Sequence, residues 1–193
     1  MKIWKKKYTG MVIAKLLTQG YMGDKLLTKT VVVLLLGLFA VPTSFGQTCN
    51  PNIPLKTPSS NFTDHGDGTV THKTTRLMWK KCVEGLSGLN CDIGSPVTRP
   101  WAEALGFSEI TFAGYSNWRL PNIKELASIL EDACYSPMIN LSIFPNDPGW
   151  LVWSSSTYAK NPDYAWRLPF SAGIDSSYSK NSRNYIRLVR NEQ

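Results

Sequence analysis

Histidine and the motifs of common catalytic sites are scarce in this sequence. Only two histidines, His65 and His72, occur among 193 residues. Neither lies in a motif with a serine nucleophile or at zinc-ligand spacing to the cysteines, and no Cys-x-x-Cys pair occurs. A glycine-rich phosphate loop before a predicted helix is also missing. These absences argue against zinc, nucleophilic and phosphoryl-transfer chemistry, so we expect a non-enzyme that needs no cofactor.

A hydrophobic run long enough to span a membrane is missing as well. The main apolar run covers ten residues, Val31 to Ala40, whereas a membrane-spanning helix needs about 20. Seven lysines precede this run, and Pro42, Ser44 and Gly46 follow it. This order predicts a secretory signal peptide over residues 1–46, with cleavage before Gln47. A retained membrane anchor is the alternative, and Met22 is a second candidate start.

A basic excess is lacking once the signal peptide is set aside. The whole chain carries a net charge of +7, but seven of its 21 Lys and Arg and one of its 14 Asp and Glu lie in residues 1–46. The remaining 147 residues therefore have a net charge of +1, which gives no basis for nucleic-acid binding. Their length suits one domain with its own hydrophobic core.

All four cysteines follow the predicted signal peptide. An even number of cysteines in an exported chain predicts two disulfides. Of the three pairings, we favour Cys82 with Cys91, because the segment between them is short and contains glycine. Cys49 then pairs with Cys134, which would attach the N-terminal arm to the end of a predicted helix.

The stretch Ala113 to Ala133 contains the best-defined helix start. Pro121 favours an extended conformation for the residue before it. Asn122 suits an N-cap, and Glu125, three residues later, completes a variant capping box. An apolar stripe at helical spacing follows, made of Leu126, Ile129, Leu130 and Ala133. We expect this helix to pack on the core.

Short strands separated by turns account for most of the rest. A second, shorter helix begins at Pro100, and three prolines between Cys49 and Ser60 predict an extended arm over residues 47–60. Strands are predicted at Phe62, Thr69 to Thr71, Arg76 to Trp79, Trp150 to Tyr158, Tyr164 to Phe170 and Asn184 to Arg190. Antiparallel strands around two helices indicate an α+β fold.

Four segments carry a resemblance to a known family. The run Gly114 to Asn122 (GYSNWRLPN), with Glu125 and Leu126 after it, resembles the signature of the Lcl C-terminal domain family, named for the end domain of a collagen-like bacterial adhesin. Residues 62–79, residues 101–105 and the segment from Trp153 to Arg190 also match, in order. The resemblance covers residues 61–193. It implies a C-type-lectin-like fold of twisted antiparallel strands, adhesion, and sulfated glycans as ligands.

A looser likeness joins the Arg-Leu-Pro-x-x-x-Glu run, Arg119 to Glu125, to the formylglycine-generating enzymes. Those enzymes use free active-site cysteines, which this sequence does not supply if both disulfides form. Asp64 and Asp67 in the DHGDG turn could present oxygens to calcium. Two carboxylates are few for that cation, so a hairpin turn is the favoured interpretation and calcium the alternative.

The C-terminal segment has the composition of a binding surface. Serine, tyrosine and asparagine are concentrated there, and residues 160–190 carry a net charge of +4, against −3 for the rest of the mature chain. Strand alternation predicts that Tyr185 and Arg187 face outward near Arg183 while Ile186 and Leu188 face the core. The candidate ligand-binding residues are Tyr158, Tyr164, Arg167, Tyr178, Arg183, Tyr185 and Arg187.

These observations favour an exported, non-catalytic binding domain of the bacterial envelope, located at the cell surface, outside the cell or in the periplasm. The expected partner is an extracellular glycan, such as a sulfated polysaccharide, or a surface protein; nucleic acid is excluded, and so is the membrane after signal removal. An enzyme of the formylglycine-generating type and a structural subunit of a surface assembly are the alternatives. Replacing Arg183 and Arg187 together by Ala should weaken glycan binding at least tenfold with little change in stability.

Overall fold

The structure is a computed structural model that describes residues 46–147, 149–174 and 176–192. The predicted signal peptide, apart from its last residue, lies outside the described residues. No helix within the described ranges is long and apolar enough to cross a membrane.

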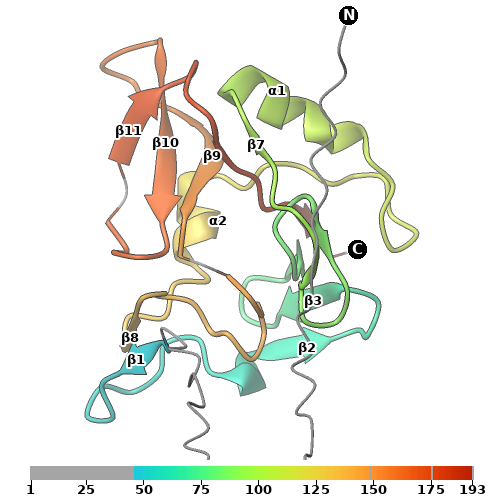
Figure 1. Cartoon of the computed structure of the whole chain (residues 1–193), viewed down its shortest axis with the longest axis vertical. Helices are drawn as coiled ribbons and strands as arrows, with labels where there is room; N and C mark the ends of the chain where they lie inside the picture. Colours follow the sequence, from blue (N-terminus) through green and yellow to red (C-terminus); the bar gives the residue numbers. More distant parts are fainter. Residues whose placement is uncertain (1–45, 148, 175, 193) are drawn as a thin grey trace, which may run out of the picture. The chain divides into compact units, whose positions relative to one another are not determined.

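Two β-sheets organise the described chain (Figure 1). The smaller has the strand order β13-β4-β3-β2, and the larger has the order β11-β10-β9-β12-β7. The smaller sheet contains β2 (Phe62–Asp64), β3 (Thr69–His72), β4 (Leu77–Lys80) and β13 (Val189–Asn191). The larger contains β7 (Thr98–Arg99), β9 (Leu151–Thr157), β10 (Tyr164–Pro169), β11 (Ser176–Ser179) and β12 (Asn184–Tyr185). Their pairings are antiparallel apart from β12 with β9, which is parallel.

Shorter elements connect and flank the sheets. Two small antiparallel pairs are formed by β1 (Thr48–Cys49) with β8 (Cys134–Tyr135) and by β5 (Leu86–Ser87) with β6 (Ile93–Gly94). The α-helices are α1 (Trp101–Leu105) and α2 (Ile123–Ala127), and the 3₁₀ turns are η1 (Ser59–Asn61) and η2 (Gly106–Glu109). This content of many strands and two short helices agrees with the predicted α+β class.

The predicted capping box is confirmed, but the helix after it is shorter than the apolar stripe indicates. Asn122 accepts a hydrogen bond from the Glu125 N–H, and the Glu125 carboxylate accepts one from the Asn122 N–H. The helix ends at Ala127 because the chain turns at Ser128, whose hydroxyl donates to the Glu125 carbonyl at 2.6 Å. The four stripe residues are nevertheless all buried. Burial was therefore predicted correctly, whereas the helix length was not.

The predicted strand from Asn184 to Arg190 is divided in two. Its first residues form β12 in the larger sheet, its last ones enter β13 in the smaller sheet, and residues 186–188 connect the two sheets. Every residue from Ile186 to Arg190 is buried. Alternation fails here because a segment that passes between two sheets has protein on both sides and no solvated face.

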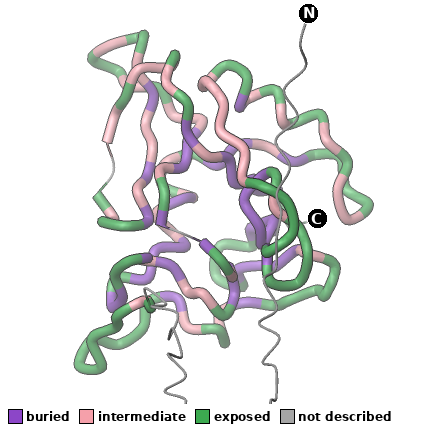
Figure 2. The backbone as a smooth tube through the Cα atoms, viewed as in Figure 1, coloured by how far each residue is buried: buried purple, intermediate pink, exposed green. Residues whose placement is uncertain are grey.

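The core contains two clusters of buried apolar residues. Figure 2 shows where along the chain the buried residues lie. One cluster includes Trp79, Leu126, Phe144 and Phe170, and the other includes Trp118, Trp153 and Leu188. Both draw residues from the C-terminal segment and from residues 62–130, so distant parts of the chain are joined through side-chain burial.

The N-terminal arm is attached to the domain by a disulfide and a buried carboxylate. Cys49 and Cys134 face each other across the β1–β8 pair and form one disulfide, and Cys82 with Cys91 form the other. Glu131, only 1% exposed, accepts hydrogen bonds from the backbone N–H groups of Lys56, Thr57 and Ala133 and from the Thr57 hydroxyl. Both predicted disulfides, Cys49–Cys134 and Cys82–Cys91, are confirmed.

Candidate functional site

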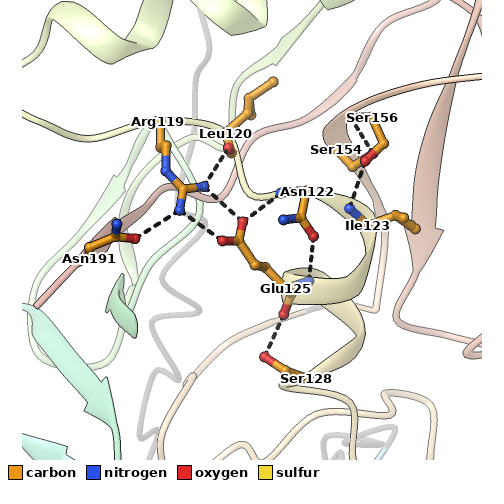
Figure 3. Close-up of polar contacts among 9 residues, drawn as sticks. All are labelled: Arg119, Leu120, Asn122, Ile123, Glu125, Ser128, Ser154, Ser156 and Asn191. Atoms are coloured by element: carbon orange, nitrogen blue, oxygen red, sulfur yellow. Dashed lines mark hydrogen bonds and ion pairs between the residues drawn. The ribbon is translucent and has the colours of Figure 1, made fainter. Parts of the chain in front are cut away.

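The signature stretch around Asn122 is occupied by structural hydrogen bonds (Figure 3). Arg119 makes a bidentate pair with Glu125, in which both N–O distances are 2.8 Å, and also donates to Asn191 in β13. The Ser156 hydroxyl in β9 accepts the Ile123 N–H, one of the unpaired donors at the start of α2. These contacts join α2 to both sheets and leave the signature residues with a mainly structural role.

The structure corrects the prediction for Arg187. This side chain is 1% exposed, and its Nη2 atom lies 2.6 Å from Oδ2 of Asp147. Arg187 Nη1 donates to the carbonyl oxygens of Lys80 and Lys81. Burial lowers the pKa of the Arg187 guanidinium, and the Asp147 charge opposes this shift. Arg187 therefore connects the crossing segment to the end of β4 and to Asp147, and its buried side chain cannot contact a ligand at the surface.

Two other predicted residues, Arg183 and Tyr185, do line one cavity. It has a volume of about 300 Å³ and is bounded by residues 149–151 and 183–185 and by Ser171. The parallel pairing of Tyr185 with Val152 places the end of β12 beside the start of β9. The cavity thus forms where the crossing segment leaves the larger sheet; we call it the Trp150 cavity.

Trp150 supplies the aromatic wall of this cavity. Its ring stacks on Tyr185 with centroids 4.1 Å apart and an interplanar angle of 23°. Trp150 is nevertheless 39% exposed, so part of the indole faces solvent. Its position depends on the preceding turn, in which the Gly149 N–H donates to Asp147 Oδ1 at 2.8 Å. The buried Arg187–Asp147 pair therefore supports the turn that presents Trp150.

Two polar residues that line the Trp150 cavity are Arg183, directly before β12, and Asn184, the first residue of β12. Arg183 is exposed, and its Nη2 donates to the Thr98 carbonyl at 2.6 Å. Asn184 is 2% exposed, and its Oδ1 accepts a hydrogen bond from Arg167 Nη1 at 3.2 Å. Within the described part of the chain, the Asn184 Nδ2 atom has no acceptor. None of the described lining residues is acidic.

Of the remaining predicted ligand residues, Tyr164 and Arg167 lie on β10, Tyr178 lies on β11, and Tyr158 directly follows β9. The Arg167 guanidinium lies over the ring of Tyr178, 3.7 Å from its centroid, and also donates to Ser176 Oγ. Burial lowers the pKa of Arg167 from its ordinary value. Tyr158 packs edge to face on Trp166, and the Tyr158 N–H donates to the Tyr164 carbonyl. Arg167 contacts Asn184, but neither it nor Tyr158, Tyr164 or Tyr178 is among the described residues that line the Trp150 cavity.

The two aspartates proposed for calcium take part in the β2–β3 turn. Asp64 Oδ2 is paired with Lys81 Nζ at 2.7 Å, and its Oδ1 accepts the Gly66 N–H. Burial opposes ionisation of Asp64, but its bonds to Lys81 and Gly66 lower its pKa. Asp67 Oδ1 accepts the Thr69 N–H and hydroxyl. Among the residues in the described ranges, no group of three or more potential metal ligands occurs. Calcium binding stays an untested prediction.

A second, somewhat larger cavity of about 340 Å³ lies between the β2–β3 turn and the Cys82–Cys91 loop. Its lining includes Lys80, which is paired with Glu84 at 2.5 Å and lies over the Phe112 ring. The cation of this cavity is already paired with a carboxylate, whereas the Trp150 cavity combines a partly exposed indole with an exposed guanidinium that has no ion-pair partner among the described residues. The Trp150 cavity is therefore the better candidate site.

Sequence reasoning missed Trp150 and Asn184. Both were placed on predicted strands, Trp150 at the start of one and Asn184 at the start of another. The composition of the C-terminal segment pointed toward Asn184, whereas Trp150 precedes that segment and had no such signal. Only the parallel contact of β12 with β9 brings them together, and that pairing has no local sequence signature.

Comparison with known proteins adds a family assignment to this geometry. A model of the Lcl C-terminal domain family matches residues 68–190. A search among curated proteins found no match. The matched range includes Trp150, Arg183, Asn184 and Tyr185.

Proposed function

Because the chain belongs to the Lcl C-terminal domain family, we propose that it is a non-catalytic binding domain of the bacterial surface whose ligand is a glycan. The family indicates a surface-associated domain, and the two disulfides fit a compartment outside the reducing cytoplasm. The glycan and the role as an adhesin are the parts that go beyond the family assignment.

The Trp150 cavity is the observation that carries this proposal. An exposed aromatic face suits the apolar face of a sugar ring, and nearby polar groups fix the orientation of the ring. The Trp150 ring is stacked on Tyr185, and an aromatic side chain with few rotatable bonds loses little conformational freedom on binding. The volume of about 300 Å³ is at the lower end of small-ligand sites. A single sugar residue of a longer chain is a suitable occupant.

We further propose that the fold is C-type-lectin-like. The arrangement that supports this is a four-stranded and a five-stranded sheet with two short helices, and a disulfide that joins Cys49 to Cys134. Such a frame places loop and strand-end residues, including Trp150, at the surface, where ligands are commonly bound.

The enzyme alternative is not favoured by the cysteines. All four are in disulfides, so no thiolate is available for chemistry of the formylglycine-generating type. A role as a structural subunit of a surface assembly would need no exposed indole beside a guanidinium.

A glycan array tests the proposal directly. The exported protein, applied at low and high salt, should bind a subset of glycans, and binding to charged members should weaken with salt. Titration of reactive thiols on the same preparation distinguishes the binding domain from the enzyme alternative, because the enzyme would need a free thiol. Binding to no glycan at either salt concentration, or a stoichiometric reactive thiol, would contradict the proposal.

A further inference from the structure

Gln47, the residue that follows the predicted signal peptide, has its side-chain amide attached to the domain. Its Nε2 atom donates to the carbonyl oxygens of Pro137 and Ile139, each at a distance of 2.6 Å. A side-chain amide nitrogen carries two N–H groups, so both are used. Both partners are carbonyl oxygens, which only accept, so the amide cannot be flipped without losing both bonds.

The chain directly after Gln47 is attached to the domain as well. β1 begins at the next residue and pairs with β8, and within this pair Cys49 forms a disulfide with Cys134. Gly46, directly before Gln47, is exposed. Cleavage before Gln47 would therefore place a new N-terminus at the surface, on a residue that is held through its side chain and through the strand that follows it.

An N-terminal glutamine can undergo an intramolecular covalent change. The free α-amine attacks the side-chain carbon Cδ, a new C–N bond closes a five-membered lactam, and the bond from Cδ to Nε2 breaks. Nε2 leaves as ammonia and takes the proton that the α-amine gives up, so the reaction needs no oxidant, reductant or second reactant. The product, pyroglutamate, has no positive charge at its nitrogen and no side-chain NH₂ group.

Cyclisation of Gln47 is incompatible with the contacts of its side chain. Loss of Nε2 removes the donor that Pro137 and Ile139 share. Ring closure also draws Cδ toward the backbone nitrogen of Gln47 itself, away from residues 137–139. The reaction therefore requires that the start of the N-terminal arm first detaches from the domain, which is a local unfolding step.

We propose that the folded domain protects Gln47 from conversion to pyroglutamate, so that the exported protein keeps a free α-amine, a proposal that rests on the predicted cleavage before Gln47. Cyclisation lowers the mass by about 17 Da, the mass of the ammonia that leaves. Intact mass of the freshly exported protein should correspond to a chain that begins at Gln47 without this loss.

The rate of cyclisation tests the protection. A peptide of residues 47–56, with serine in place of Cys49, is the unfolded reference. During incubation in the same neutral buffer, the native protein should lose ammonia at least tenfold more slowly than this peptide. In concentrated guanidinium chloride, the unaltered protein should react at the rate of the peptide, because the contacts of Gln47 are then broken.

Two double variants locate the protection. Cys49→Ser with Cys134→Ser removes the bond that attaches the arm beside Gln47, and it should accelerate cyclisation at least threefold. Cys82→Ser with Cys91→Ser also removes one disulfide, but from a different loop, and it should leave the rate unchanged. Circular dichroism establishes that each variant is folded under the conditions of the incubation.

An exported chain that begins at another residue, or that carries pyroglutamate when it is isolated, would overturn the proposal. Equal rates for the native protein and the peptide would do the same. Equal acceleration by both double variants would show that attachment of the arm is not the cause of the protection. The comparison of the unaltered protein with and without denaturant decides the question if a variant does not fold.

Discussion

Arg187 Nη2 and Asp147 Oδ2 lie 2.6 Å apart in an ion pair whose side chains are 1% and 2% exposed. The pair links the segment that crosses between the sheets to the turn that presents Trp150. Arg187 therefore belongs to the buried framework behind the candidate site, because its side chain does not reach the surface.

Breaking this pair should be strongly destabilising. Asp147→Asn leaves the Arg187 charge buried without a counter-ion, which typically costs about 3 to 5 kcal/mol. Arg183→Ala, at the surface, should change the free energy of unfolding by less than about 0.5 kcal/mol. Denaturant unfolding of both variants measures the difference. Similar stabilities would show that Arg187 is not buried as described. The joint replacement of Arg183 and Arg187 is thus unsuitable as a binding test, because Arg187→Ala should impair folding.

The two disulfides should contribute unequally to stability. The Cys49–Cys134 bond closes a sequence separation of 85 residues, and the Cys82–Cys91 bond one of 9. Loop-closure entropy predicts losses of about 4 to 5 and about 2 to 3 kcal/mol when each pair is replaced by serine. Denaturant unfolding of the two double variants is the measurement. A larger loss for the Cys82–Cys91 pair would contradict the entropic argument.

Glu125 should contribute to acid sensitivity. Burial opposes its ionisation, but hydrogen bonds from Arg119 and the Asn122 N–H outweigh burial and lower its pKa below the ordinary value of 4.5. The unfolded state then binds the proton first, so this contribution is present above about pH 4.5 and is lost as the pH falls through the folded-state pKa. Glu125→Gln should reduce the loss of stability between pH 6 and pH 3. An unchanged pH profile would contradict this role.

His72 should contribute at a higher pH. Burial lowers its pKa below the ordinary value of 6.5, and its ring stacks on Phe62. The unfolded state binds the proton more readily, so stability falls as the pH decreases below about 6.5 and stops changing below the folded-state pKa. His72→Gln should flatten the stability profile between pH 7 and pH 5. His65→Gln, at an exposed position of the same hairpin, serves as the control, and an equal flattening by both would reject the assignment.

Local signals predicted the parts of the fold that depend on neighbouring residues. The Asn122–Glu125 box, the start of α1 after Pro100 and the β2–β3 hairpin all lie within a few residues of their sequence cues. The length of α2 was overestimated because Leu130 and Glu131 find partners in distant segments, at Ile139 and at Thr57. The outward orientation of Arg187 was wrong because alternation presumes one solvated face. Whether an arginine is buried or exposed depends on tertiary packing, which the local sequence pattern does not specify.

The most direct test of the account is the glycan affinity of Trp150→Ala compared with that of Tyr135→Ala. Both substitutions remove an exposed aromatic side chain, but only Trp150 lines the proposed site. With a glycan identified on the array, Trp150→Ala should weaken binding at least tenfold, since truncating a Trp at the centre of a binding site typically costs about 2 kcal/mol or more, while Tyr135→Ala should bind like the unaltered protein. Equal affinities of the two folded variants would place the glycan site elsewhere and contradict the account.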